Sequence, residues 1–339
     1  MNVGIDVGYS SVKVVGGPDR LIIFPSVVGT PDRARFAVFD LDGHIVLDVP
    51  GDGSWLVGEG AVAQSRFVDR REDRGWISSE TYHRLMLAGF SELTTATACD
   101  LTVVTGLPVA FYSADKDALR NRFLGQHRLT REGRRAQLFR VTECRVIPQP
   151  FGTLLAEALN NQGKIVNHDL ATGSVGVIDV GGKTTNLLSV SRLAEIGRET
   201  ASVNLGAWDV ARAVREFLAD HCPGLELRDH LVVEAVVNRR VKYFGEPVDL
   251  GDVIDAALEP MANQVLAQAS QLWNGAAGLD AILVAGGGAL LLGPHLQRAF
   301  PHARIVENPI FANALGYWRF AQRFAQAGLP AALPGNIAR

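Results

Sequence analysis

The sequence predicts an α/β protein made of two related lobes. A similar phrase occurs twice, as IDVGYSSVK at residues 5–13 and as IDVGGKTTN at residues 178–186. Each copy ends an apolar run in Asp-Val-Gly and resumes with hydroxyl and aliphatic residues, a pattern typical of a strand, a tight turn and a second strand. Short strands and helical spacing recur in both halves of the chain, which favours a layered α/β architecture.

The length and composition fit two hydrophobic cores. A chain of 339 residues with 47% hydrophobic side chains can bury two cores of ordinary domain size. We expect lobe I over residues 1–160, completed by a C-terminal helix over 311–328, and lobe II over 161–310, with a helical subdomain at about 207–270. The polar stretch NNQGKIVNHD marks the expected boundary between the lobes.

The first lobe is predicted to be rich in strands. Its expected strands and helices, read from apolar periodicity, are strands at 3–7, 11–15 and 101–104 and helices at 113–125 and after Pro150. Ser113 or Asp115 is the expected N-cap of the first of these helices.

The second lobe is predicted to be rich in helices. The expected elements are helices at 207–220, 229–244 and 252–273, and a buried strand at 281–284 that leads into a triple-glycine turn. Val210, Val214 and Leu218 share one face of the first helix, which is therefore expected to pack on a core. The last helix is expected to pack back on lobe I.

The net charge and the cysteine spacing argue against a direct nucleic-acid binder and against a disulfide-linked or zinc-binding protein. Thirty-three basic and 36 acidic residues give a net charge of -3, which is not the footprint of a direct nucleic-acid binder, so a role with DNA would need an adaptor. Cys99, Cys144 and Cys222 lack disulfide or metal spacing, as expected of a cytoplasmic protein. The eight histidines show no metal spacing, and no apolar run approaches the roughly 18 residues of a membrane span.

The second copy of the repeated phrase is similar to a P-loop but departs from it. That motif requires a glycine where this chain has Val177, and it precedes a helix, whereas TTNLLSV continues as a strand. Gly181 and Gly182 are therefore expected at a hairpin tip. Because a glycine tip lets backbone N–H groups approach an anion, two such tips can hold one phosphate chain. Asp6 and Asp179, at the strand ends, suit a magnesium ion held through waters.

These motifs carry a resemblance to a known family. IDVGYSSVK and VIDVGGKTTN resemble the two phosphate motifs of the actin-like ATPase superfamily, and ILVAGGGALLL resembles its adenosine motif. VIPQPFGTLLA and VNLGAWDVA resemble its two connecting segments. The resemblance covers nearly the whole chain and implies two ribonuclease-H-like lobes around a nucleotide cleft. With VVTGLP and PIFANALGY, the chain looks most like the ParM/StbA plasmid-segregation actins.

The resemblance implies roles for single residues. Those implied to contact ATP or ADP are Gly8, Tyr9, Ser10, Ser11, Lys13, Gly181, Gly182, Lys183, Thr184, Gly206, Arg239, Lys242, Gly286, Gly287 and Gly288. Lys13 is the implied phosphate-contacting lysine. Arg239 and Lys242 would lie around adenine, although a solvated helix face is an equal alternative. Asp6 and Asp179 would hold Mg²⁺ through waters and act in catalysis with Gln149.

One catalytic position departs from the pattern of many prokaryotic actins. They place Glu after Ile-Pro in the first connecting segment, where this chain has Gln149. Actin itself has glutamine there, and glutamine can orient a water without being a strong base. Hydrolysis is therefore expected, at a reduced rate.

The implied function is that of a cytoplasmic ATPase that binds ATP and Mg²⁺ and polymerises with itself. Such filaments would serve plasmid or DNA segregation, or intracellular positioning, through a DNA-binding adaptor and without direct contact to nucleic acid or membrane. Two alternatives remain open. The first is a small-molecule kinase of the same fold, which would need an aspartate base near an acceptor pocket. The second is a non-polymerising ATP-binding assembly factor.

Overall fold

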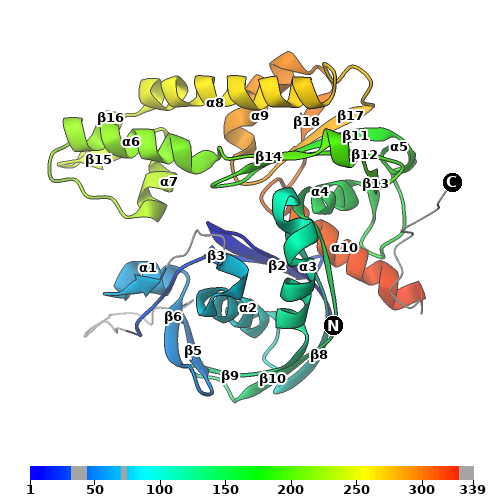
Figure 1. Cartoon of the computed structure of the whole chain (residues 1–339). Coiled ribbons are helices and arrows are strands. Elements are labelled where there is room, and N and C mark those ends of the chain that lie inside the picture. Colours follow the sequence, from blue (N-terminus) through cyan, green and yellow to red (C-terminus); the bar gives the residue numbers. More distant parts are fainter. Residues whose placement is uncertain (32–43, 70–74, 328–339) are drawn as a thin grey trace.

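Two large sheets, one from each half of the chain, form the framework of the molecule (Figure 1). The computed structural model describes residues 1–31, 44–69 and 75–327. The first sheet occupies the lower part of Figure 1 and the second sheet the upper part, with helices α4 (Gln149–Ala158) and α10 (Ala312–Ala327) between them.

The first sheet is built around the strand that opens the chain. Strand β1 (Asn2–Val7) pairs antiparallel with β2 (Ser11–Gly17) and parallel with β8 (Ala98–Leu107). The sheet runs in the order β3-β2-β1-β8-β10 and then continues through β9, β5, β6, β4 and β7. The bounds of these other strands are β3 Arg20–Pro25, β4 Val28–Gly29, β5 Ile45–Val49, β6 Gly53–Val57, β7 Val68–Asp69, β9 Gly125–Arg131 and β10 Gln137–Pro148.

The second sheet repeats this arrangement. Strand β11 (Ser174–Val180) pairs antiparallel with β12 (Thr185–Ser191) and parallel with β17 (Ala281–Ala285). The edge strands are β13 Ala194–Glu195, β14 Ala201–Val203 and β18 Ala303–Ile305. The registers match as well, since Asp6 lies opposite Lys13 and Asp179 lies opposite Asn186. The predicted α/β fold of two related lobes is confirmed.

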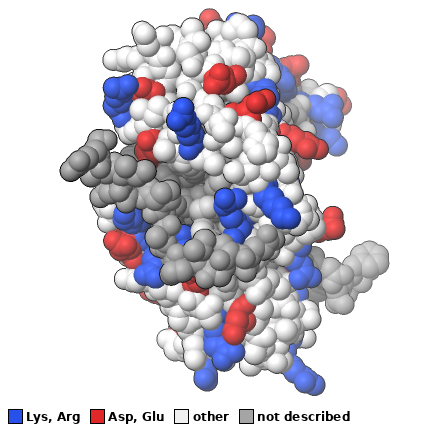
Figure 2. Space-filling view, turned by 90° about the vertical axis from the view of Figure 1, so that its right-hand side faces the viewer, with Lys and Arg blue, Asp and Glu red and all other residues white. Residues whose placement is uncertain are grey.

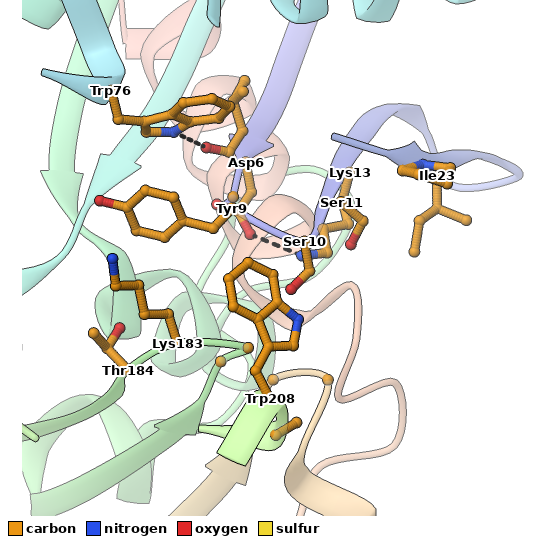
Figure 3. Close-up of a pocket in the computed structure, with 18 of the residues that line it drawn as sticks. Asp6, Tyr9, Ser10, Ser11, Lys13, Ile23, Trp76, Lys183, Thr184 and Trp208 are labelled. Carbon is orange, nitrogen blue, oxygen red and sulfur yellow. Dashed lines mark hydrogen bonds and ion pairs between the residues drawn. The ribbon is translucent and has the colours of Figure 1, made fainter. Parts of the chain in front are cut away.

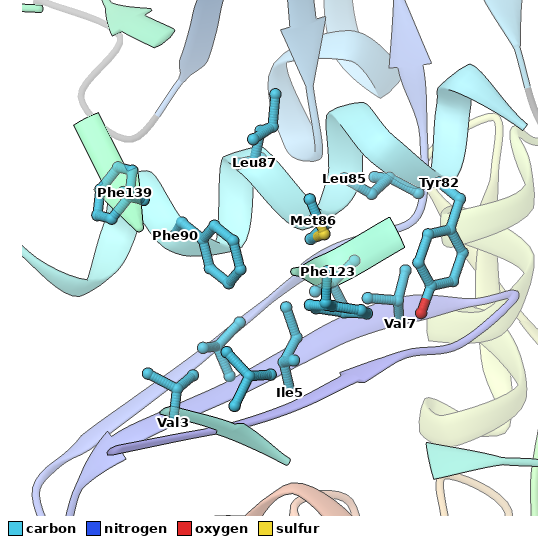
Figure 4. Close-up of a cluster of buried hydrophobic side chains, with 14 of the residues drawn as sticks. Val3, Ile5, Val7, Tyr82, Leu85, Met86, Leu87, Phe90, Phe123 and Phe139 are labelled. Carbon is cyan, nitrogen blue, oxygen red and sulfur yellow. The ribbon is translucent and has the colours of Figure 1, made fainter. Parts of the chain in front are cut away.

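Lobe I is held by a core between its sheet and two helices. Val3 and Ile5 of β1 face Leu85 and Phe90 of α2 (Glu80–Leu93), and Phe123 of α3 (Val109–Phe123) packs among them (Figure 4). All five side chains are buried. Burial of this kind stabilises a lobe by roughly 1.5–3 kcal/mol for each large apolar side chain. Ala61 of the short helix α1 (Glu59–Gln64) packs in a separate small cluster with Val27 and Leu56.

Helices cover the second sheet. Val210, Val214 and Leu218 of α6 are buried as predicted, and Phe217 is partly buried against the same cluster. The helices of this half are α5 His168–Thr172, α6 Ala207–His221, α7 Asp229–Asn238, α8 Gly251–Leu272 and α9 Ala289–Ala299. A small hairpin of β15 (Arg240–Tyr243) and β16 (Glu246–Asp249) follows α7.

The last helix packs on lobe I, as expected. A Cβ atom on Gly4 of β1 would lie 2.1 Å from the Ala314 carbonyl oxygen, so only glycine allows α10 to approach this strand. Similarly, a Cβ atom on Gly316 would lie 1.7 Å from the Gly152 carbonyl oxygen, where α10 crosses α4. The expected end of this helix, residue 328, lies outside the described residues. We retain the division of the lobes at residue 160 as a proposal.

Two local predictions are wrong. Helix α3 begins at Val109, after Pro108, so neither Ser113 nor Asp115 caps it. The segment 229–244 is helical only to Asn238, because Arg239 adopts a left-handed conformation with φ 54° and the chain turns into β15. The Arg239 carbonyl then accepts a hydrogen bond from the Leu250 N–H, which closes the hairpin.

The surface shows mixed charge. Lys and Arg side chains are interspersed with Asp and Glu over the face in Figure 2. The expectation that the chain does not bind nucleic acid directly stays a prediction. Within the described ranges, none of the helices combines the length and apolar character that crossing a membrane requires.

Candidate functional site

A cavity of about 820 Å³ lies between the two lobes. It is within the size range of small-molecule and cofactor sites. The tips of the two repeated hairpins line it from opposite sides, Gly8 to Ser11 from lobe I and Gly181 to Thr184 from lobe II (Figure 3).

The first tip is a closed turn that the neighbouring strand supports. The Gly8 N–H donates to the Ser11 carbonyl oxygen at 3.2 Å. The Ser26 hydroxyl donates to the Gly8 carbonyl oxygen at 2.6 Å, and the Ser26 N–H donates to the Ser10 carbonyl oxygen at 3.0 Å. Because Ser26 donates hydrogen bonds to two carbonyl oxygens of the tip, the protein itself fixes the conformation of this turn.

The second tip has the same turn and is anchored on α6. The Gly181 N–H donates to the Thr184 carbonyl oxygen at 2.9 Å, the counterpart of the Gly8 bond. The N–H groups of Ala207 and Trp208 donate to the carbonyl oxygens of Gly181 and Gly182 at 3.0 and 2.9 Å. A Cβ atom on Gly206 would lie 2.3 Å from the Gly182 carbonyl oxygen. Gly206 therefore packs directly against the backbone of this tip, and a side chain at this position would displace it.

The two tips meet across the cavity. A Cβ atom on Gly182 would lie 2.1 Å from the Ser10 Oγ, and this buried hydroxyl has no hydrogen-bond partner in the described part of the chain. The Lys183 ammonium lies 5.3 Å from the centre of the Tyr9 ring, and Figure 3 shows it pointing toward that ring. The two tips therefore present an ammonium group and hydroxyl groups to the cavity between them.

Asp6 lies at the end of β1 and is fixed by two polar partners. The Lys13 Nζ lies 3.7 Å from its Oδ2 (Figure 3), and the Gln149 Nε2 donates to its Oδ1 at 3.1 Å. Gln149 is the first residue of α4, so the helix start holds its side chain at the cavity wall. The structure thus brings together Asp6, Lys13 and Gln149, three residues that the sequence singled out.

Asp179 lies at the matching position of the second repeat and depends on a residue that the sequence did not reveal. The Asn313 Nδ2 donates to its Oδ2 at 2.9 Å. The Asn313 Oδ1 accepts from the N–H and the hydroxyl of Thr153, at 3.2 and 2.9 Å, so the amide is oriented toward Asp179. Burial raises the pKa of Asp179 to about 6, while the Asn313 hydrogen bond opposes that rise. Asn313 lies within PIFANALGY, but its spacing alone carries no chemistry.

The carboxylates fit a hydrated cation better than a directly bound one. Among the residues that the structure describes, no three His, Cys, Asp or Glu side chains gather as a metal-binding group. Asp6 and Asp179 both line the cavity beneath the tips. Mg²⁺ keeps several waters in such sites and needs only one or two carboxylates, so the arrangement fits an ion held through waters.

The triple-glycine turn forms another part of the wall. Gly286 has φ 91°, and a Cβ atom there would lie 2.3 Å from the Val180 carbonyl oxygen. Gly288 packs against Val180 behind the cavity surface. Gly287 lines the cavity, and a Cβ atom on it would meet no atom within 4 Å. The space in front of Gly287 is therefore open to a ligand.

Four of the predicted contact residues do not line the cavity. Two of them, Gly206 and Gly288, pack behind its wall. Arg239 and Lys242 do not line the cavity, because Arg239 ends α7 and Lys242 lies on the hairpin beyond it. Arg239 is engaged by Asp255 at 2.6 Å. The part of α7 that does reach the cavity carries Val233 and Val237. The assignment of Arg239 and Lys242 to the surroundings of adenine came from the family resemblance, and their contact with a nucleotide stays a prediction.

Two family models match the chain. Residues 4–152 match the "Actin like proteins N terminal domain", and residues 177–298 match "Archaeal actin homologue MreB-like, C-terminal". The two matches divide at the same place as the two sheets and leave out α10.

Known proteins resemble the chain over almost its full length. An archaeal actin homolog of Thermoplasma acidophilum is 28% identical, over 95% of this chain and 98% of that protein. The structure of an archaeal actin homolog in complex with ADP is 25% identical, with a TM-score of 0.78 over 95% of this chain and 99% of that one. A 15-stranded ParM filament from Clostridium botulinum has a TM-score of 0.80 at 22% identity, with the same coverage.

Proposed function

Because this chain belongs to the actin-like ATPase superfamily, we propose that it binds and hydrolyses ATP in the cavity between its lobes and assembles head to tail into filaments. One observation carries the proposal. Two hairpin tips of the same construction meet across one cavity, each with a buried aspartate at the end of its first strand.

The tips are suited to a phosphate chain. Lys13 and Lys183 supply positive charge, and the Ser10 hydroxyl supplies a donor that has no partner within the described structure. Phosphate oxygens accept such charge-assisted hydrogen bonds, which are stronger than neutral ones. The structure of an archaeal actin homolog in complex with ADP supports a nucleotide as the ligand.

Asp6 and Asp179 are the residues that would hold a hydrated Mg²⁺. When bound, this ion neutralises charge on the phosphates and so assists departure of the terminal group. Lys13 keeps Asp6 paired, and Asn313 orients the carboxylate of Asp179. These contacts would hold both carboxylates in place to accept hydrogen bonds from the waters of such an ion.

Gln149 is proposed to orient the attacking water. Its amide is tied to Asp6 in the described conformation, so a shift of α4 relative to β1 would free it for a water. Assembly is expected to favour that shift, because a ligand or neighbour that prefers one arrangement of the lobes moves the equilibrium toward it.

Self-association is the proposed use of the ATPase cycle. Some proteins of this fold form filaments, as the ParM filament from Clostridium botulinum does. Head-to-tail contacts that do not close a ring produce open filaments. We propose that the filament works in the cytoplasm in the segregation of a plasmid or other DNA, or in positioning another cargo, through an adaptor protein.

The test combines three measurements on the purified chain: nucleotide binding, phosphate release and light scattering, with ATP, ADP or no nucleotide and with or without Mg²⁺. We expect ATP and Mg²⁺ to give binding, phosphate release and a rise in scattering that later decays. Phosphate release without scattering would favour a non-polymerising ATPase. Phosphate transfer to an added hydroxyl compound would favour a kinase.

A further inference from the structure

A buried tyrosine hydroxyl contacts one residue of the proposed reaction. Tyr317 belongs to α10, which lies beside α4 between the two sheets (Figure 1), and its side chain is fully buried. Its hydroxyl donates to the backbone carbonyl oxygen of Gln149 at 3.2 Å. A buried tyrosine hydroxyl usually finds a hydrogen-bond partner, and here that partner is the first residue of α4. Tyr317 therefore contacts Gln149 without lining the cavity itself.

Three glycines make room for the side chain of Tyr317. A Cβ atom on Gly106 of β8 would lie 2.0 Å from its hydroxyl oxygen, and one on Gly152 of α4 would lie 2.6 Å from its Cε1. A Cβ atom on Gly4 of β1 would lie 3.0 Å from the Tyr317 Cβ. Because protein interiors are close-packed, three segments of chain around one ring leave its hydroxyl little freedom to move. The hydroxyl is thus fixed against Gln149.

Helix α10 holds the start of α4 through two side chains that are one helical turn apart. Tyr317 donates to the Gln149 carbonyl oxygen, and Asn313 accepts from the N–H and the hydroxyl of Thr153. Residues four positions apart lie on the same face of a helix, so one face of α10 meets one face of α4. The backbone at the start of α4 is therefore held to α10 at two points.

The hydroxyl contacts the backbone of Gln149 and leaves its amide free. The amide donates to the Asp6 Oδ1 at 3.1 Å, and its side-chain bonds can still rotate when it leaves this carboxylate for a water. The bond from Tyr317 instead restrains the backbone from which this side chain extends. Burial raises the pKa of Tyr317, and the carboxylates of Asp6 and Asp179 add to the rise, so the hydroxyl keeps its proton and remains a donor.

We propose that Tyr317 is a positioning residue for ATP hydrolysis: its hydroxyl holds the backbone of Gln149 in the place from which the amide orients the attacking water. This inference rests on the proposed function, because it assumes that Gln149 has that role. Groups that orient reactants need support that fixes them within about 0.5 Å. A misplacement of about 1 Å can slow a reaction by about a hundredfold. Since Asn313 still holds α4, we expect a smaller effect from the loss of one hydroxyl.

The experiment measures the rate of phosphate release at saturating ATP, and the affinity for ATP, in the parent, Tyr317→Phe, Gln149→Ala and the double variant. Tyr317→Phe keeps the ring between the glycines and removes only the hydroxyl. We expect its rate to fall by about three- to tenfold and its ATP affinity to stay within about twofold of the parent's. In the Gln149→Ala background the same change should have no further effect, because the hydroxyl acts through that side chain.

Tyr243→Phe is the matched control. The Tyr243 hydroxyl also donates to a backbone carbonyl oxygen, that of Pro223, at 3.0 Å, and this residue does not line the cavity. Its rate of phosphate release and its ATP affinity should stay at the parental values. Denaturation midpoints of both phenylalanine variants ensure that each rate is measured on folded protein.

Five results would overturn the inference. An equal loss of rate in the parental and Gln149→Ala backgrounds would show that the hydroxyl does not act through Gln149. A loss of ATP affinity as large as the loss of rate would show a general support of the cavity. Faster phosphate release by Tyr317→Phe would show that the bond keeps the amide away from the water. A parental rate in Gln149→Ala would refute the inference and leave hydrolysis itself standing. If the parent releases no phosphate, the proposed function fails and the inference with it.

Discussion

Replacing Asn313 with alanine should destabilise the protein in a way that depends on pH. The amide links α10 to Asp179 on β11 and to Thr153 on α4, with bonds of 2.9, 3.2 and 2.9 Å. A hydrogen bond to a charged group contributes about 1.5–3 kcal/mol, and leaving the two donors of Thr153 without an acceptor adds to the cost. We expect Asn313→Ala to lower the free energy of unfolding by about 3 kcal/mol at pH 7.5.

The pH dependence follows from the carboxyl group of Asp179. Its pKa is raised in the folded protein to about 6 from an ordinary value of 3.8, so protonation favours the folded state. The stability that it contributes is fully present below pH 3.8 and is lost as the pH rises through 6. This loss is about 3 kcal/mol when one pKa unit is taken as about 1.4 kcal/mol. Without Asn313 the pKa of Asp179 should rise further.

The assay is chemical denaturation of the parent, Asn313→Ala, Asp179→Asn and the double variant at pH 5.0 and pH 7.5. At pH 5.0 the protonated carboxyl needs no donor, so the penalty of Asn313→Ala should shrink to about 1–2 kcal/mol. The penalty should also shrink in the Asp179→Asn background. A penalty that is equal at both pH values, or that stays below about 0.5 kcal/mol, would refute the coupling between the two side chains.

The other predictions concern catalysis, binding and the crossing of helices. Asp179→Ala should reduce phosphate release at least about tenfold, because the second lobe loses its hold on the hydrated ion; parental turnover at saturating Mg²⁺ would contradict this role. Gly287→Val should weaken ATP binding while the denaturation midpoint stays close to the parent's, since a side chain there enters open cavity space; equal ATP affinity would show that the glycine is only a bend. Gln149→Ala should slow hydrolysis, leave ATP affinity nearly unchanged and prolong light scattering, and a parental rate of phosphate release would exclude it as the residue that orients water. Gly316→Ala should lower the free energy of unfolding by about 1–3 kcal/mol, because its Cβ would overlap the Gly152 carbonyl, and an unchanged value in a denaturant titration would count against that contact.

The residue pattern alone was enough to predict the two repeated strand–turn–strand units. The two Asp-Val-Gly phrases predicted two strand–turn–strand units, because apolar runs broken by glycine and followed by hydroxyl and aliphatic residues allow few local structures. Asp6 and Asp179 were placed correctly at strand ends by the same reasoning. The family resemblance supplied the expectation that the two units face one cleft, which residue spacing by itself does not contain.

Which side chains share the cavity depends on contacts between segments that are far apart in the chain. Asn313 donates a hydrogen bond to Asp179, although the two residues are 134 positions apart in the chain. They come together because α10 crosses α4 at Gly152 and Gly316, where the absence of side chains lets the two backbones touch. Val233 lines the cavity, whereas Arg239 does not. Arg239 ends α7 in a left-handed conformation, which helical periodicity does not reveal. Local patterns record the conformations that neighbouring residues prefer. Contacts between distant segments depend on packing the whole chain, and no short stretch of sequence carries that information.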